Sequence, residues 1–468
     1  MFNTSMITTK SPLMLHDKQG NQLLSKATIA GLFCLFIIQA APALGPIATF
    51  IGFDLILSVY LISLFRNKLS FLFLLHPLVA LITSYGFEMP YTEIGVAFTY
   101  LDTFNRFVDP TSLTIDIDSL WSALLPEEAH EGTNYGIGVV YVGVIPILWL
   151  PAYLFTNAPD IVIYLSLGVF TMLYAAISVS VALAFGVLRK DVLLIIALYC
   201  TVSPTFLEIN STLHRYGLLF FGLFLFLIAY IGLLRGGLGL RKLMLLALIL
   251  VAMALVSASK APLLLSLVMF VLLEFFSRNK LPLLSKIFYR LNNPSRVWFL
   301  IIMIAIAQYL AHFIAPEKYV TGFSQQGGQY EALINIPILG LLVRLFYAML
   351  SPFPWINFSQ LELYGYNTLL FLLHIPSALL AAWIIFSFFS RTRQIVTGND
   401  DIKITALFGV AIMSSLTFSA IGFHVYLSPA LPFIAVILLN KKTRISLTYP
   451  ILFIIGMELI AQIAKVMR

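Results

Sequence analysis

Long apolar runs, separated by short polar segments, follow a polar stretch at residues 1–26. Many of these runs approach the length of about 20 residues that a helix needs to cross a bilayer. Backbone in lipid must satisfy its own hydrogen bonds, and runs rich in Leu, Ile, Phe and Ala do so as helices. The pattern predicts an all-α, polytopic integral membrane protein with about 12–14 transmembrane helices. The apolar runs are 27–43, 45–65, 69–86, 136–156, 161–187, 191–207, 215–234, 242–257, 261–276, 297–315, 334–350, 366–390, 403–421, 425–440 and 447–465.

Composition agrees with this class of protein. The chain is 60% hydrophobic and 10% charged, and its mean hydropathy is +0.96. The net charge of +7 is explained by loops that face anionic lipid, so we expect no nucleic-acid partner. Cys34 and Cys200 lie inside apolar runs and are interpreted as packing residues. No HExxH, CxxC, Walker or GxGxxG pattern occurs, so the sequence predicts neither a cofactor nor a metal site.

Basic loops orient the chain in the membrane. By the positive-inside rule they are cytoplasmic, which predicts a cytoplasmic tail at 1–26, one helical membrane domain at 27–468 and an external C-terminus. An even number of crossings must separate two cytoplasmic loops, and the apolar runs break this rule twice. We therefore predict one or two re-entrant or interfacial outer segments. One is 334–350, which contains Pro337 and Arg344, and the other is 91–105 or 136–156.

Two outer regions follow from this topology. A large periplasmic loop at 86–135 carries many acidic and aromatic residues and the single basic residue Arg106. Aromatic platforms with carboxylates suit a carbohydrate, but the same composition also fits an acidic lid, and both interpretations stay open. The second periplasmic region, 316–365, contains the predicted re-entrant segment.

Five basic residues fall on the outer side, where the charge rule makes them scarce. Arg215 is predicted at the start of a helix, where free N–H groups and the guanidinium both favour an anion. Arg344 lies in the run that breaks the parity, and Lys260 lies at an outer turn. The structural alternatives are ion pairs or snorkelling toward headgroups. The five cations are Arg106, Arg215, Lys260, Lys318 and Arg344.

Three residues near these cations could move a proton. His214 and Glu208 precede the helix that follows Arg215, and His424 lies in a short outer turn. Histidine and carboxylate side chains are the usual general acids and bases. We predict His214, His424 and Glu208 as candidate catalytic residues, and Arg215, Arg344 and Lys260 as candidate ligands of a diphosphate.

Four segments give the chain a resemblance to a known family. HRYGLLFFG at 214–222, SASKAPLLL at 257–265, SPFPW at 351–355 and HVYLSPALPF at 424–433 resemble Wzy-type O-antigen and exopolysaccharide repeat-unit polymerases, which are polytopic GT-C-like glycosyltransferases. Members often carry Arg where this chain has Lys260 or His424, so catalytic roles do not transfer directly.

The resemblance implies an activity in the bacterial inner membrane. A growing glycan on undecaprenyl diphosphate would be transferred to a new lipid-linked repeat unit at the periplasmic face. The implied partners are undecaprenyl-diphosphate-linked glycans, membrane lipids and a chain-length regulator protein, and no cofactor is implied.

Two other functions remain open. In a polyprenyl-phosphate-sugar-dependent GT-C transferase, Asp102, Asp116 or Asp118 would be the key carboxylate. In a lipid-linked oligosaccharide flippase or other transporter, paired charges are expected near the membrane midplane.

Overall fold

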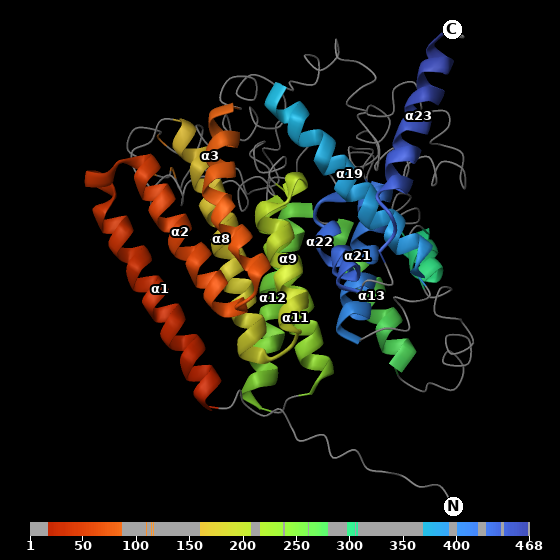
Figure 1. Cartoon of the computed structure of the whole chain (residues 1–468). Helices are drawn as coiled ribbons and strands as arrows, with labels where there is room; N and C mark the ends of the chain where they lie inside the picture. Colours follow the sequence, from red (N-terminus) through yellow and green to blue (C-terminus); the bar gives the residue numbers. More distant parts are fainter. Residues whose placement is uncertain are drawn as a thin grey trace, which may run out of the picture.

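The computed structural model describes long helices and their connections (Figure 1). Within this described part of the chain all regular structure is helical, without strands. Five of the described helices are long and apolar enough to cross a membrane, which is consistent with a helical membrane protein. The described residues are 17–86, 109, 114, 116, 160–206, 216–236, 239–260, 262–278, 297–304, 306–307, 368–392, 400–419, 427–440 and 444–466.

The main elements follow the predicted apolar runs. They are α1 (Asp17–Leu44), α2 (Pro46–Phe65), η1 (Lys68–Leu75), α3 (His76–Gly86), α8 (Asp160–Phe185), α9 (Lys190–Val202), α11 (Tyr216–Leu234), α12 (Leu240–Lys260), α13 (Pro262–Arg278), α19 (Thr368–Ser390), α21 (Asp400–Ser419), α22 (Leu431–Ala435), η9 (Val436–Leu439) and α23 (Thr448–Val466). Helix α1 begins at Asp17, well before the predicted start at residue 27. The predicted outer segments 91–105, 136–156 and 334–350 lie outside the described residues.

Two predicted helices are broken into shorter elements. The run 69–86 becomes the 3-10 helix η1 followed by α3, and Pro77 stands at the second position of α3. The described part of the run 425–440 holds only the short helix α22 and the 3-10 helix η9. Pro432 stands in the first turn of α22 and explains why this helix does not extend back toward residue 427, since proline removes an N–H donor and clashes with the preceding helical turn.

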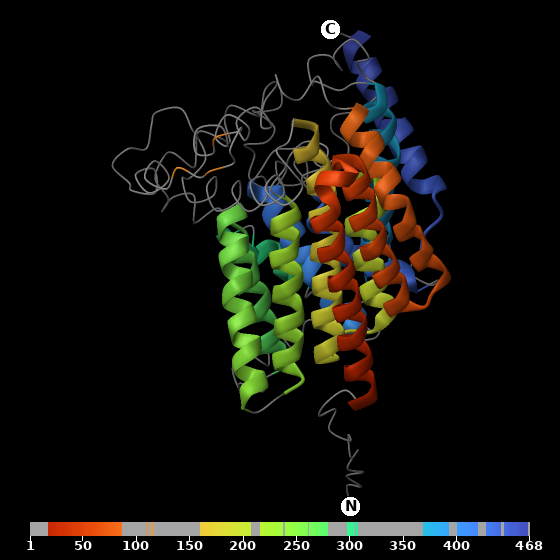
Figure 2. The same cartoon turned by 90° about the vertical axis from the view of Figure 1, so that its left-hand side faces the viewer.

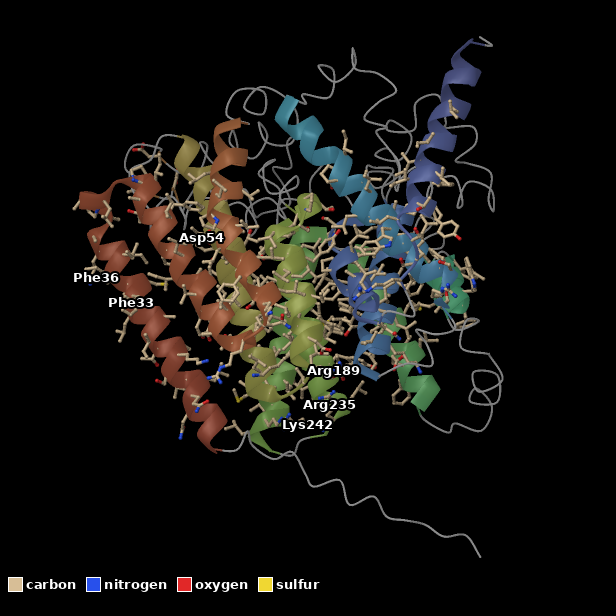
Figure 3. The ribbon with its side chains drawn as sticks, viewed as in Figure 1. Phe33, Phe36, Asp54, Arg189, Arg235 and Lys242 are labelled. Carbon is tan, nitrogen blue, oxygen red and sulfur yellow. The ribbon has the colours of Figure 1, made fainter. Side chains whose placement is uncertain are left out.

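Apolar side chains on the peripheral helices face outward. In α1, Phe33 and Phe36 are 57% and 64% exposed, and in α12 Leu250 is 69% exposed. Figure 3 shows Phe33 and Phe36 on α1 at the edge of the bundle. Such extended apolar faces are rare on soluble monomers and suit contact with lipid. Cys34 and Cys200 are free and buried, as predicted.

Aromatic side chains join the central helices. Phe408 of α21 packs edge-on against Phe270 of α13 at 5.3 Å and against Phe433 of α22 at 5.0 Å between ring centroids. Helix α22 lies so close to α21 that a Cβ on Gly409 would be 2.9 Å from the backbone nitrogen of Ile434. The long helices run roughly alongside one another around this core (Figure 2).

Polar contacts join several helices at one end of the bundle. The Arg235 guanidinium, just after α11, forms an ion pair with Asp401 of α21 and donates to the Gly186 carbonyl oxygen at 2.9 Å. The Arg189 backbone N–H donates to the other Asp401 oxygen at 3.1 Å. Arg241 donates to the Phe185 carbonyl oxygen at 2.8 Å, so basic side chains satisfy the last carbonyls of α8.

We call this end, which holds Arg235 and Asp401, the cytoplasmic end, because its basic residues belong to the loops predicted to be cytoplasmic. The opposite end is the outer end. Figure 3 shows Arg189, Arg235 and Lys242 near one another at the cytoplasmic end.

Arg235→Ala is expected to destabilise the bundle by about 1–2 kcal/mol, because it leaves the mostly buried Asp401 carboxylate without its guanidinium partner. Thermal unfolding in detergent measures the loss. Lys242→Ala, on the same face but exposed, is the control and should melt within error of the wild type. Equal melting temperatures for the two variants would contradict a structural role for the ion pair.

Candidate functional site

Two of the four family-like segments contact each other through aromatic rings. Phe220 belongs to HRYGLLFFG and Phe433 belongs to HVYLSPALPF. Their rings stack with centroids 5.4 Å apart and planes inclined by 16°. Both side chains are buried, at 5% and 0% exposure. Segments more than 200 residues apart in the sequence therefore share one buried contact near the outer half of α11.

The described residues on either side of the predicted acid-base segment also meet. Phe206 precedes this segment, and Phe220 follows it in α11. Their rings form an edge contact at 6.2 Å between centroids. Thr205 accepts a hydrogen bond from the Tyr199 hydroxyl at 3.2 Å, which links the residues just before this segment to α9. Phe206, just before the stretch that carries Glu208, His214 and Arg215, therefore packs against the first turns of the helix that follows this stretch.

A third family-like segment is placed by the register of α11 against α12. A Cβ on Gly222 would be 2.9 Å from Leu255 Cβ, and a Cβ on Gly232 would be 2.8 Å from Leu245 Cδ2. The two helices are antiparallel, so a residue further toward the start of α11 lies level with one further toward the end of α12. Continuing the register of the Gly232–Leu245 and Gly222–Leu255 contacts places Gly217 level with Lys260. The SASK turn therefore lies at the same outer end as the start of α11.

The predicted site residues themselves are described only in part. Lys260 is the last residue of α12, and its side chain lies outside the described residues. The other five candidates also lie outside them, so their predicted roles stay predictions. These five are Glu208, His214, Arg215, Arg344 and His424. The helix that follows Arg215 begins at Tyr216, which agrees with the predicted helix start.

The structure also shows a buried polar pair that sequence reasoning missed. His76 Nδ1 lies 2.7 Å from Asp54 Oδ2, and the two residues are 1% and 0% exposed. Asp54 lies near the middle of the apolar helix α2, and His76 begins α3. Among the residues that the structure describes, Asp54 Oδ1 and His76 Nε2 are buried without a hydrogen-bond partner. Figure 3 labels Asp54 within the bundle.

The missed signal was an aspartate inside a long apolar run. An ionisable residue within a membrane span is a functional hypothesis by default, because burying it is unfavourable unless it has a partner or a role. The partner could not be found from sequence spacing, since the break between η1 and α3 sets the position of His76. Among the described residues, no group of three or more His, Cys, Asp or Glu side chains could hold a metal.

Comparison with known proteins adds no relative: no family model, curated protein or solved structure matches the chain.

Gly222→Ala tests whether close contact between α11 and α12 fixes the relative position of their ends at the outer end of the bundle. The added methyl group would be 2.9 Å from Leu255 Cβ, so we expect destabilisation of roughly 1–3 kcal/mol from overpacking, measured by thermal unfolding in detergent. Gly217→Ala is the matched control, because a Cβ there meets nothing within 4 Å. Equal destabilisation by Gly217→Ala and Gly222→Ala would contradict this register of α11 against α12.

Proposed function

We propose that this chain is an oligosaccharide repeat-unit polymerase of the bacterial inner membrane. It would transfer a growing glycan from undecaprenyl diphosphate to a new lipid-linked unit at the periplasmic face. The proposal includes about 12–14 transmembrane helices and re-entrant outer segments as predicted from the apolar runs. It rests on one observation above all: two family-like segments share the buried Phe220–Phe433 contact in the outer half of α11, and the register of α11 against α12 brings a third, the SASK segment, level with the start of α11.

A diphosphate leaving group accounts for cations at this end. In the transfer, the acceptor hydroxyl oxygen bonds to the anomeric carbon of the donor glycan. The bond from that carbon to the diphosphate oxygen breaks, and the electron pair leaves on undecaprenyl diphosphate. The hydroxyl proton passes to a base, for which His214, His424 and Glu208 are the candidates. Preorganised positive groups in a low-dielectric site stabilise the charge that develops on the diphosphate.

The rigid pairing of α11 with α12 supports a two-sided anion site. Arg215 directly precedes Tyr216, and Lys260 ends α12 at the level of Gly217. Close packing at Gly222 fixes the separation of these two helix ends. The start of α11 also contributes the positive end of its helix dipole. Arg344 would complete the cation set from the second periplasmic region.

Arg215→Ala and Arg344→Ala are each expected to abolish long glycan chains while the protein still inserts into the membrane. Loss of a charge-assisted contact made in the transition state typically lowers the rate by about 100-fold or more. Glycan length is measured by gel electrophoresis of the product ladder, and insertion by quantifying the protein in the membrane fraction. Lys318→Ala is the control, because Lys318 stands beside Glu317 in a polar segment.

Wild-type ladders from both arginine variants would overturn the diphosphate clamp. Loss of activity in Asp102→Ala, Asp116→Ala or Asp118→Ala, with the arginines dispensable, would instead support a polyprenyl-phosphate-sugar-dependent transferase.

A second candidate function, transport of a lipid-linked oligosaccharide, is favoured by the Asp54–His76 pair. Paired ionisable groups inside a span are typical of proton relays and substrate pathways. Each partner also retains one polar atom without a hydrogen bond, and a moving proton or polar group could use that atom.

Asp54→Asn and His76→Gln separate the two functions in cells. A flippase with either change should leave lipid-linked units in the cytoplasmic leaflet, where a membrane-impermeant probe added from outside does not label them. A polymerase should leave single units exposed on the periplasmic side. Ser58→Ala is the matched control, because the Ser58 hydroxyl of the same helix α2 donates a buried, non-ionisable hydrogen bond to the Phe73 carbonyl oxygen of the neighbouring η1. Periplasmic single units in both pair variants would exclude the transport role.

A further inference from the structure

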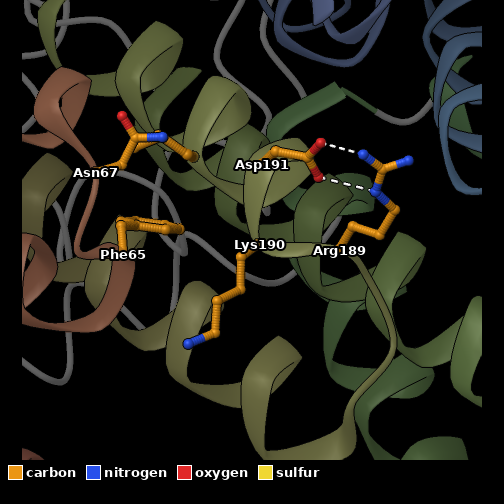
Figure 4. Close-up of a pocket in the computed structure, with 6 residues that line it drawn as sticks. Phe65, Asn67, Arg189, Lys190 and Asp191 are labelled. Carbon is orange, nitrogen blue, oxygen red and sulfur yellow. Dashed lines mark hydrogen bonds and ion pairs between the residues drawn. The ribbon is translucent and has the colours of Figure 1, made fainter.

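A small cavity opens at the cytoplasmic end between α2 and α9. Its volume is about 410 Å³. Figure 4 shows its side chains, with Lys190 between the α2 side and the Arg189–Asp191 pair. The cavity is lined by Phe65, Asn67, Arg189, Lys190, Asp191 and Leu194. Because the cavity is at the opposite end from the proposed glycan site, a ligand here would serve a separate purpose.

Three cations gather beside this cavity without a carboxylate of their own. Lys26 of α1 donates to the Ser63 carbonyl oxygen at 2.7 Å, and Lys190 donates to that of Leu64 at 3.4 Å. The positive charges of Arg66 and Lys190 repel that of the Lys26 ammonium. In the part of the chain that the structure describes, no ion pair joins a carboxylate to Lys26, Arg66 or Lys190.

Contacts with the end of α2 explain the position of the two lysines but use only part of their donors. A lysine near a helix C-terminus is stabilised by the last carbonyls and by the helix dipole. An ammonium has three N–H donors, so after one hydrogen bond to α2 each lysine can still bind an anion. An anion would also relieve the repulsion among the three like charges.

The acidic residue in the cavity does not neutralise this cluster. The Arg189 guanidinium binds both carboxylate oxygens of Asp191, with its Nε donating to Oδ1 at 3.0 Å. The charges of Arg189 and Asp191 therefore compensate each other. The positive charges of Lys26, Arg66 and Lys190 remain.

Exposed apolar side chains occur on the elements that carry or adjoin these cations. Leu24, on the same helix α1 as Lys26, is 67% exposed, and Phe71 of η1, which follows Arg66, is 60% exposed. Leu69 and Leu72 of η1 are also exposed. An anion with a hydrocarbon tail would use the cations and the apolar side chains together, whereas a free phosphate would use only the cations. Basic pockets between transmembrane helices on the cytoplasmic side are typical sites for anionic lipid headgroups.

We propose that Lys26, Arg66 and Lys190, with the adjoining cavity, bind the phosphate headgroup of an anionic phospholipid of the cytoplasmic leaflet. The acyl chains would lie against the exposed apolar residues of α1 and η1. The bound lipid would hold α1, α2 and α9 together at this end, independently of any reaction at the outer end.

Binding of phosphatidylglycerol to the full chain in a neutral detergent, measured by native mass spectrometry, tests this site. Lys26→Gln, Arg66→Gln and Lys190→Gln should each raise the apparent Kd roughly fivefold, since a basic residue near the membrane surface contributes about that factor. Lys242→Gln is the matched control, because Lys242 is an exposed cation of the cytoplasmic end on α12, and it should change the Kd less than about twofold.

Folding and ligand identity have separate controls. Arg66 is exposed, so Arg66→Gln should melt like the wild type in lipid-free detergent while still losing affinity. Inorganic phosphate, compared with chloride at equal ionic strength, should neither displace the lipid nor stabilise the protein. Equal increases in Kd for Lys242→Gln and Lys26→Gln would show that the lipid responds to general surface charge and not to this cluster. Displacement by inorganic phosphate would show a free-anion site, and either result overturns the proposal.

Discussion

Helix ends must satisfy their free carbonyl groups, and in this bundle basic side chains do so where the helices reach the cytoplasmic end. Arg241 binds the last carbonyl of α8 and Arg235 binds that of Gly186 just after it, while Lys26 and Lys190 bind carbonyls in the last turn of α2. Because each basic residue comes from a different element than the carbonyl it binds, the same contacts fix the packing of the helices. The basic residues from which the orientation of the chain was predicted therefore also hold the bundle together.

From this fixed end, the helix pairs carry their register toward the outer end. Contact between α11 and α12 at Gly232 and at Gly222 keeps one register along most of their length. The Phe220–Phe433 stack adds α22 to that pair. A ligand at the outer end would thus meet groups whose backbone positions are set in advance, and such preorganisation is the main physical requirement of a site that stabilises developing charge.

The long apolar runs predicted a helical membrane protein and most of the described helix positions, because such runs in lipid have few alternatives to a helix. The pattern failed where proline changes the local backbone, as in η1 with α3 and in α22 with η9. It also overlooked Asp54, since one polar residue barely alters the hydropathy of a long run. For the candidate site, sequence reasoning located the start of α11 and the end of α12. It could not foresee that Phe220 and Phe433 stack, because such a contact depends on the packing of distant segments.

Two polar features involve α2, namely the buried Asp54–His76 pair and the cluster of cations at the end of the helix, and they have different functional implications. Asp54 and His76 compensate each other inside the span, so their pairing is explained by structure alone unless a proton or polar group uses the two unpartnered atoms. The cations at the end of α2 repel one another, so their clustering is unfavourable without an anion. The hydrogen bond between Asp54 and His76 makes the first pair tolerable in the absence of any ligand, whereas the second cluster, although Lys26 and Lys190 bind α2 carbonyls, keeps a repulsion that an anion would relieve. The mutual repulsion of the clustered cations is therefore stronger physical evidence for a binding site than the burial of the Asp54–His76 pair.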